Sequence, residues 1–212
     1  MIHLPNLPVF LLAALILLLT PGPAVLYIIA RSMDQGRLAG FVSVLSIESG
    51  NSVHVLGATL GLSAILMSSA LAFTVVKDLG AAYLIYLGIR RLLSRGQGQE
   101  IARFQKQSLR RIYSQGVLVA ILNPKTALFF LAFLPQFVDP STGSITLQFL
   151  TLGGLFVMMA VVTDSMYSLL ASTAGNWLKR NRSFLSAERY VVGSVYIGLG
   201  VTAALSHNAL SE

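Results

Sequence analysis

Three ionisable residues stand inside long apolar stretches of the chain, where a charge is costly. They are Glu48, Lys125 and Asp164. A charge at the centre of a bilayer costs at least about 2.5–3.5 kcal/mol, so each side chain should face the protein interior and have a partner. We expect Lys125 to pair with Glu48 or Asp164, and a buried carboxyl group there to exchange a proton. An internal ion pair that only fixes helix packing is the alternative.

Two proline-containing breaks interrupt the apolar stretches at a similar depth. They are Thr20-Pro21-Gly22-Pro23 and Asn123-Pro124. Proline removes a backbone hydrogen bond inside a helix, and a carbonyl group freed in lipid needs another partner. Pro21 lies about 15 Å along a helix from Arg31, and Pro124 about 20 Å from Arg111. Both breaks are therefore predicted near the membrane midplane, with the two prolines facing one cavity.

Backbone groups freed at such breaks suit a molecule that carries both charges. The helix halves that begin near Ala24 and Thr126 direct their N-termini at the midplane, and helix N-termini attract anions. The preceding halves end in carbonyl groups near Leu19 and Leu122, which suit a cation. A zwitterion fits this arrangement. The alternative is that proline is simply tolerated in membrane helices.

The composition indicates an integral membrane protein. Of its 212 residues, 55% are hydrophobic and 11% are charged, whereas soluble domains carry about 25% charged residues. A membrane-spanning helix needs about 20 mainly apolar residues. The apolar runs predict six helices, at 6–30, 38–62, 70–92, 114–136, 147–172 and 190–207.

The basic residues predict how the chain is oriented. Most of them lie in three loops, 31–37, 90–111 and 179–189. The positive-inside rule places these loops in the cytoplasm, and six spans then put both termini outside. The net charge of +7 is explained by these loops rather than by a nucleic-acid partner. Segment 99–112 is either a short amphipathic helix on the membrane surface or a solvated linker.

The chain repeats itself in three pairs of matching segments. The pairs are 19–28 with 122–131, 40–61 with 154–175, and 80–88 with 193–200. Because each copy holds an odd number of spans, the second copy enters the membrane from the opposite side, as in many secondary transporters. We predict an all-α integral membrane protein of six transmembrane helices, arranged as two inverted three-helix repeats with broken helices 1 and 4. The repeats cover 1–98 and 114–212, and segment 99–113 joins them.

Four motifs along the chain carry a family resemblance. "TPGP", "GFVSVLSIESGNSVHVLGATLGLSA", "GAAYLIYLGIRRL" and "ILNPKTALFFLAFLPQF" resemble the lysine-exporter (LysE/RhtB) family of bacterial amino-acid exporters. The resemblance implies a multi-pass protein of the bacterial cytoplasmic (inner) membrane. It also implies export of amino acids such as lysine, threonine or homoserine, by antiport driven by the proton motive force. The motif positions carried over are Pro21, Gly22, Pro23, Glu48, Gly50, Asn51, Asn123, Pro124, Lys125 and Asp164.

Together these patterns predict a proton-coupled exporter of a small amino acid or derivative, and not an enzyme. The predicted substrate-binding residues are Thr20, Pro21, Gly22, Pro23, Asn51, Asn123, Pro124 and Lys125. The predicted proton-coupling residues are Glu48 and Asp164. An exporter of another small metabolite or of a cation on the same scaffold is the alternative.

The composition also limits the expected cofactors and partners. The chain has no cysteine and three histidines, which argues against soft-metal and thiol chemistry. No cofactor and no metal site are predicted. The expected partners are the amino-acid substrate, protons and the lipid bilayer, and the small-residue helix faces permit a homodimer.

Overall fold

The computed structural model describes residues 6–62 and 107–178, together with seven single positions. These are Val75, Ala82, Ile85, Tyr86, Ile89, Ile197 and Val201. Apart from these positions, the predicted helices 70–92 and 190–207 and most of segment 99–113 lie outside the described residues. The described part therefore contains the first two of the three predicted helices of each repeat.

The described residues are helical almost throughout, and none of them lies in a β-strand. The N-terminal part holds α1 (Leu7–Leu19), α2 (Pro23–Gly57) and the π-helical η1 (Ala58–Leu62). The C-terminal part holds α5 (Leu109–Ile121), α6 (Pro124–Leu128), the π-helical η2 (Phe129–Phe133), the 3₁₀ turns η3 (Leu134–Phe137) and η4 (Pro140–Thr142), and α7 (Ile145–Leu178).

Both predicted helix breaks are present. The axis bends by 49° between α1 and α2, and by 42° between α5 and the segment Pro124–Phe137. Each second half starts with a proline, Pro23 or Pro124. Proline suits the first helical position because its missing N–H would have no partner there anyway. The prediction of broken helices 1 and 4 is thus confirmed for the described residues, whereas the complete six-helix inverted repeat stays a prediction.

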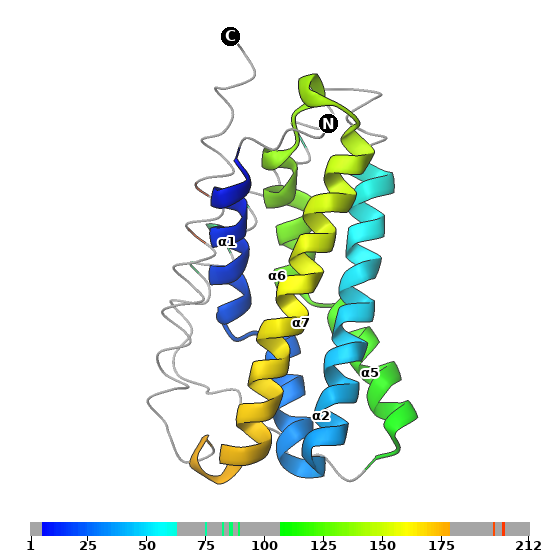
Figure 1. Ribbon diagram of the computed structural model, residues 1–212, viewed down its shortest axis with the longest axis vertical. Coiled ribbons are helices and arrows are strands. Elements are labelled where there is room, and N and C mark those ends of the chain that lie inside the picture. Colours follow the sequence, from blue (N-terminus) through cyan, green and yellow to red (C-terminus); the bar gives the residue numbers. More distant parts are fainter. Residues whose placement is uncertain are drawn as a thin grey trace.

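The first predicted helix is longer than expected. It was expected to end at residue 30, but helical structure continues through the predicted loop to Gly36, which has φ 81° and ψ −171°. A positive φ costs glycine little, and this single residue reverses the chain direction. α2 is therefore a helical hairpin whose two arms lie side by side (Figure 1).

The other described helices also extend beyond their predicted ends. α5 begins at Leu109 rather than at residue 114, with the side chain of Ser108 accepting a hydrogen bond from Arg111 N. The last residues assigned to the 99–113 linker are thus part of a helix. α7 covers Ile145–Leu178, against a predicted 147–172, because helical hydrogen bonding continues past the apolar stretch at both ends.

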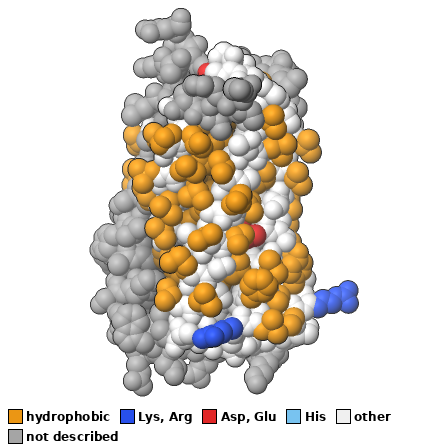
Figure 2. Space-filling view, in the orientation of Figure 1, with side chains coloured by type: hydrophobic (Ala, Val, Ile, Leu, Met, Phe, Trp, Pro, Cys, Tyr) orange, Lys and Arg blue, Asp and Glu red, His pale blue; other side chains and the backbone are white. Residues whose placement is uncertain are grey.

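The described helices have the length and composition of membrane spans. Residues Ile145–Thr173 form one such helix, and counting each bent pair as one span gives three in the described part. Figure 2 shows hydrophobic side chains over most of the described surface of one face, with Lys and Arg near one end. The turn between the two arms of α2, the start of α5 and the end of α7 all lie at that end (Figure 1). Most of loop 90–111 and all of loop 179–189 lie outside the described residues, so the expectation that the three basic loops share one side stays a prediction.

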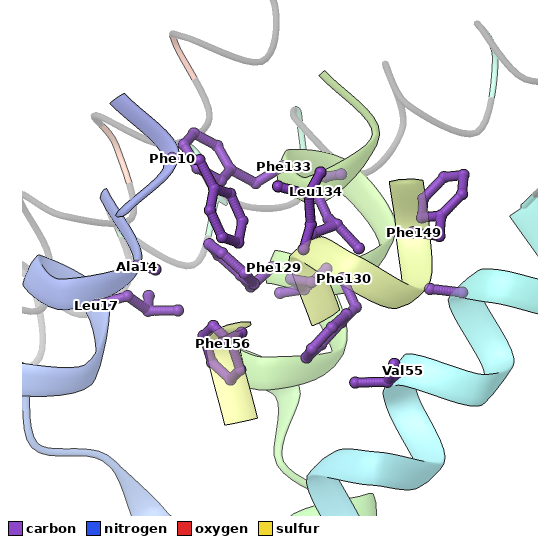
Figure 3. Close-up of a cluster of buried hydrophobic side chains, with 14 of the residues drawn as sticks. Phe10, Ala14, Leu17, Val55, Phe129, Phe130, Phe133, Leu134, Phe149 and Phe156 are labelled. Carbon is purple, nitrogen blue, oxygen red and sulfur yellow. The ribbon is translucent and has the colours of Figure 1, made fainter. Parts of the chain in front are cut away.

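A cluster of aromatic side chains fills the opposite half of the bundle (Figure 3). It joins side chains of α1, α2, η2, η3 and α7, with Phe10, Ala14, Leu17, Val55, Phe129, Phe130, Phe133, Leu134, Phe149 and Phe156 at its centre. The rings of Phe129 and Phe156 stack with centroids 4.8 Å apart, and an aromatic pair contributes about 0.5–1.5 kcal/mol beyond its buried area. The cluster fixes the outer halves of both broken helices against α7.

Small residues let α5 approach α2 almost to backbone contact. A Cβ atom added at Gly116 would overlap the side chain of Ser46, and one at Gly50 would overlap Ala120 and the carbonyl oxygen of Val117. Helices in membranes pack closely where such residues replace larger ones. Because Gly50 stands two residues after the predicted proton-coupling Glu48, this contact holds that part of α2 against the end of α5.

Candidate functional site

At the first break, no residue of the break itself donates to the carbonyl oxygens of Leu19 and Thr20 or caps the start of α2 with its side chain. α1 ends at Leu19, and Thr20 turns to an extended conformation with φ −86° and ψ 112°. The Thr20 hydroxyl donates back to the Ile16 carbonyl oxygen at 2.7 Å, so it satisfies a group of its own helix. At the other side of the break, Gly22 precedes α2 and no side chain caps the helix N-terminus.

The second break has a capping residue of its own. Asn123 is the N-cap of α6, and its Oδ1 accepts a hydrogen bond from Lys125 N at 3.2 Å. Its Nδ2 donates to Thr126 Oγ1 at 3.0 Å. This buried asparagine thus caps the start of α6, while the carbonyl oxygen of Ala120 near the end of α5 is bound by His54 Nε2 of α2 at 3.1 Å.

Lys125 joins the two breaks. Its side chain is buried, with 6% exposed, and its Nζ donates to the carbonyl oxygen of Thr20 at 2.5 Å. The side chain runs directly over Gly22, where an added Cβ would lie 3.2 Å from Lys125 Cδ. The ammonium group therefore lies at the carbonyl end of α1, where a cation is favoured by the helix dipole.

Glu48 and Asp164 meet in the interior, from α2 and α7. Their carboxyl groups are close enough to interact electrostatically, and Asp164 also interacts electrostatically with Lys125. The Oε2 atom of Glu48 accepts from Asn51 Nδ2 at 3.0 Å. Two carboxyl groups this close repel each other when both are ionised. The pair is therefore a candidate site for an exchangeable proton, beside a buried cation.

Two buried acceptor atoms next to this pair have no hydrogen-bond donor among the described residues. They are Glu48 Oε1 and Asn51 Oδ1. A buried acceptor without a donor is costly and uncommon in folded proteins. Both atoms belong to predicted site residues, so they offer places where the ammonium group of a small molecule or a proton could be bound.

Tyr167 is a site residue that sequence reasoning did not assign to the site. It lies one helical turn after Asp164 on α7, and its hydroxyl donates to the carbonyl oxygen of Leu19 at 2.8 Å. The last two carbonyl groups before the first break, those of Leu19 and Thr20, are thus bound by side chains from the second half of the chain. The only signal in the sequence was the spacing of Tyr167 from Asp164.

The predicted site residues fall into two groups in the structure. Buried residues are Thr20, Pro21, Gly22, Glu48, Asn51, Asn123, Lys125 and Asp164, and exposed residues are Pro23 and Pro124. The buried group comes together around Lys125 and the carboxyl pair. The two exposed prolines start their helices, and the prediction that Pro21 and Pro124 face one cavity stays a prediction.

Arg31 differs from its predicted place in a loop. It is fully buried within α2, where its guanidinium donates to the side-chain oxygens of Gln35, Gln107 and Gln115 at 2.9 to 3.4 Å and lies over the ring of Tyr27. The side chains of Gln107 and Gln115 supply hydrogen-bond partners that make the burial of Arg31 possible. A count of charges along the sequence cannot reveal such partners. This network links α2 to α5 at the basic end of the molecule.

Broken helices that meet at buried charges inside an apolar helical bundle define a membrane transport protein. Sequence comparison supports this class directly. The model of the LysE type translocator family matches residues 15–207. The chain therefore belongs to the LysE type translocator family, as the motifs predicted.

Curated relatives match over nearly their full length. The chain is 30% identical to an uncharacterized membrane protein, YrhP, of Bacillus subtilis, over 91% of this chain and 95% of the relative. It is 29% identical to the homoserine/homoserine lactone efflux protein of Salmonella typhimurium, over 94% of this chain and 96% of the relative. It is also 30% identical to an uncharacterized membrane protein of Vibrio cholerae, over 92% of this chain and 94% of the relative. No solved structure matches the chain.

Proposed function

We propose that this protein exports a small amino acid, or an amino-acid derivative, from the cytoplasm in exchange for protons. The observation that carries the proposal is the position of Lys125 between the two helix breaks and beside the Glu48–Asp164 carboxyl pair. These groups offer one place for an anion, one for a cation and one for a proton within a single buried site.

The carboxylate of the substrate would bind at the start of α2. No side chain caps this helix N-terminus, so its first N–H groups are available, and the helix dipole favours an anion there. Lys125 passes directly over Gly22 at this point and would add a positive charge. The matching end of α6 is less suited to this role, because Asn123 already caps it.

The amino group of the substrate would bind between the carbonyl oxygen of Thr20 and the carboxyl pair. The ammonium group of Lys125 supports a cation position here, since it contacts Thr20 and interacts with Asp164. The relatives named for homoserine and homoserine lactone efflux support an amine site. The amino group is the charged group that these two compounds share.

Protons would be exchanged at the carboxyl pair. Two carboxyl groups in contact hold a proton most firmly when no extra cation lies nearby. A substrate ammonium group next to Asp164 would favour the ionised pair, and the shared proton would leave to the side from which the substrate came. Binding of substrate and of proton would therefore exclude each other, which is the requirement for antiport.

Transport by the purified protein in proteoliposomes tests this proposal. A labelled panel of L-homoserine, L-threonine, L-lysine and homoserine lactone is followed with an imposed proton gradient. We expect gradient-driven efflux of at least one member, and a reduction of at least about 100-fold in both Glu48→Gln and Asp164→Asn, as for loss of a buried charged hydrogen bond.

The matched control is Thr151→Val, an isosteric change on α7 at a residue that bonds only its own helix among the described groups. This variant should keep at least half of the wild-type rate. No gradient-dependent flux for any member of the panel would overturn the proposal, as would normal flux in both carboxyl variants.

A further inference from the structure

The side chain of Lys125 has the same charged group as the predicted substrate. Both carry a primary ammonium group on an aliphatic carbon, with three hydrogen-bond donors and one positive charge. In the structure the Lys125 ammonium lies on the Thr20 carbonyl oxygen and interacts with Asp164. This is the position in which the proposed function places the amino group of the substrate, so the two groups would compete for it.

The first break needs a cation or donor at this position. Pro21 and Pro23 have no backbone N–H. The residues after α1 therefore cannot supply all the hydrogen bonds that the last carbonyl groups of α1 need. In the described structure the Thr20 carbonyl is satisfied by a side chain from the other half of the protein, 105 positions along the chain. A carbonyl group left bare at this depth would oppose any movement that exposes it to lipid.

We infer that Lys125 is a tethered substitute for the substrate amine, which holds the first break closed whenever the carrier holds no substrate. The inference rests on the proposed function and adds a specific role to it. When the substrate enters, its ammonium group takes the place on Thr20, and Lys125 turns toward the substrate carboxylate beside Gly22. When the substrate leaves, Lys125 returns, and the carrier can move back without cargo.

This role has a measurable consequence for the mode of transport. A carrier that moves back only when loaded exchanges one substrate molecule for another but cannot produce net export. Without the Lys125 ammonium the unloaded carrier would have a bare carbonyl end, whereas the loaded carrier would still have the substrate amine in place. Loss of the ammonium group should therefore reduce net efflux far more than exchange.

The test compares net efflux with exchange in proteoliposomes loaded with labelled L-homoserine. Net efflux is measured into substrate-free medium under a proton gradient, and exchange is measured against unlabelled L-homoserine at equal pH. We expect Lys125→Met and Lys125→Leu, which carry neither a charge nor a donor, each to lower net efflux by at least about 20-fold more than exchange, because an unsatisfied buried group opposes only the unloaded step. Lys125→Arg keeps a cation and should keep the ratio within about threefold of the wild type.

Leu122→Met, an apolar change at an exposed residue of the second break, is the matched control and should leave the ratio unchanged. Lys125→Leu serves where Lys125→Met fails to insert. If the neutral variants lose net efflux and exchange equally, or lose neither, the inference is overturned. The proposed function is left intact in both cases. A wild-type protein that moves L-homoserine in neither mode would instead overturn the proposed function for this substrate, together with the inference.

Discussion

The two helix breaks have similar sequences but differ in how their backbone is satisfied. At the second break the start of α6 is capped locally, because Asn123 bonds both the backbone of Lys125 and the side chain of Thr126, and the carbonyl oxygen of Ala120 at the end of α5 is bound by His54 of α2. The first break has no such capping side chain, and its carbonyl end is bound by Lys125 and Tyr167 from the second half of the chain. Both carbonyl ends are therefore completed by distant side chains, and only the second break has a local cap at its helix start.

This difference indicates which contacts of the site change when segments of the protein move. A cap supplied by a neighbouring residue forms with the helix itself and changes little as the halves of the protein move. A contact between distant segments forms only when those segments are close. The bonds at the first break thus depend on the relative position of α1, α6 and α7, as expected for a place where a substrate enters and leaves.

Among the variants that distinguish the two breaks, Gly22→Val is expected to have the largest effect, which is on the rate of efflux. An added Cβ would already lie 3.2 Å from Lys125 Cδ and 3.7 Å from its Nζ, so the methyl groups of valine would fill the space of the ammonium group. The extended backbone of Gly22, with φ −139° and ψ −172°, suits valine, so folding should be preserved. We expect the initial rate of L-homoserine efflux to fall about 100-fold, from an overpacking cost of about 1–3 kcal/mol.

The control for Gly22→Val is Leu122→Ala at the second break. Leu122 is 69% exposed, and its truncation should change the efflux rate by less than about twofold, because surface changes have small effects. A loss in Leu122→Ala as large as that in Gly22→Val would contradict the proposed difference between the breaks.

Asn123→Ala should have an effect of intermediate size, and it should lower the free energy of unfolding. The change removes an N-cap and leaves the backbone N–H of Lys125 without its bond, at a cost of about 2 kcal/mol. We expect the melting temperature in detergent to fall by about 4–8 °C. Thr20→Val, at the equivalent position of the first break, removes only a bond within its own helix and should cost about 0.6 kcal/mol. Equal shifts in the two variants would show that the breaks do not differ in this way.

Tyr167→Phe should have the smallest of the three effects. It removes the hydroxyl group on Leu19 while Lys125 still binds Thr20, so the carbonyl end keeps one of its two partners. The loss of about 1 kcal/mol corresponds to an efflux rate about fivefold lower. Tyr113→Phe removes a comparable hydroxyl bond, to Ser49 on the outer surface, and should leave the rate unchanged. The prediction fails if both variants have the same rate.

The sequence predicted features that depend on local chemistry. Proline cannot continue a helix wherever it stands, so Pro21 and Pro124 located both breaks without knowledge of the tertiary structure. Likewise, apolar stretches located α7 and the bent pairs, because lipid excludes charge along a whole span. Glu48 and Asp164 were expected to be internal for the same reason.

Features that depend on distant contacts could not be predicted. The burial of Arg31 requires Gln107, which precedes α5, and Gln115 within α5, both more than 70 positions away along the chain. The choice between partners for Lys125 was also open, since depth alone places Glu48 and Asp164 at one level without fixing which groups touch. The hydroxyl of Tyr167 found its partner at Leu19 through the packing of α7 against α1, which no local pattern encodes.

The turn at Gly36 has a mechanical consequence. Only this residue separates the two arms of α2, and the arms pack tightly where Gly40 meets Ser32, so we expect the arm that starts at the first break and the arm that carries Glu48 to move together. The bend at Thr20-Pro21-Gly22 would then be the pivot of this movement. A rotation there would shift the proposed proton site and the neighbouring end of the proposed substrate site together, so that one movement changes access to both.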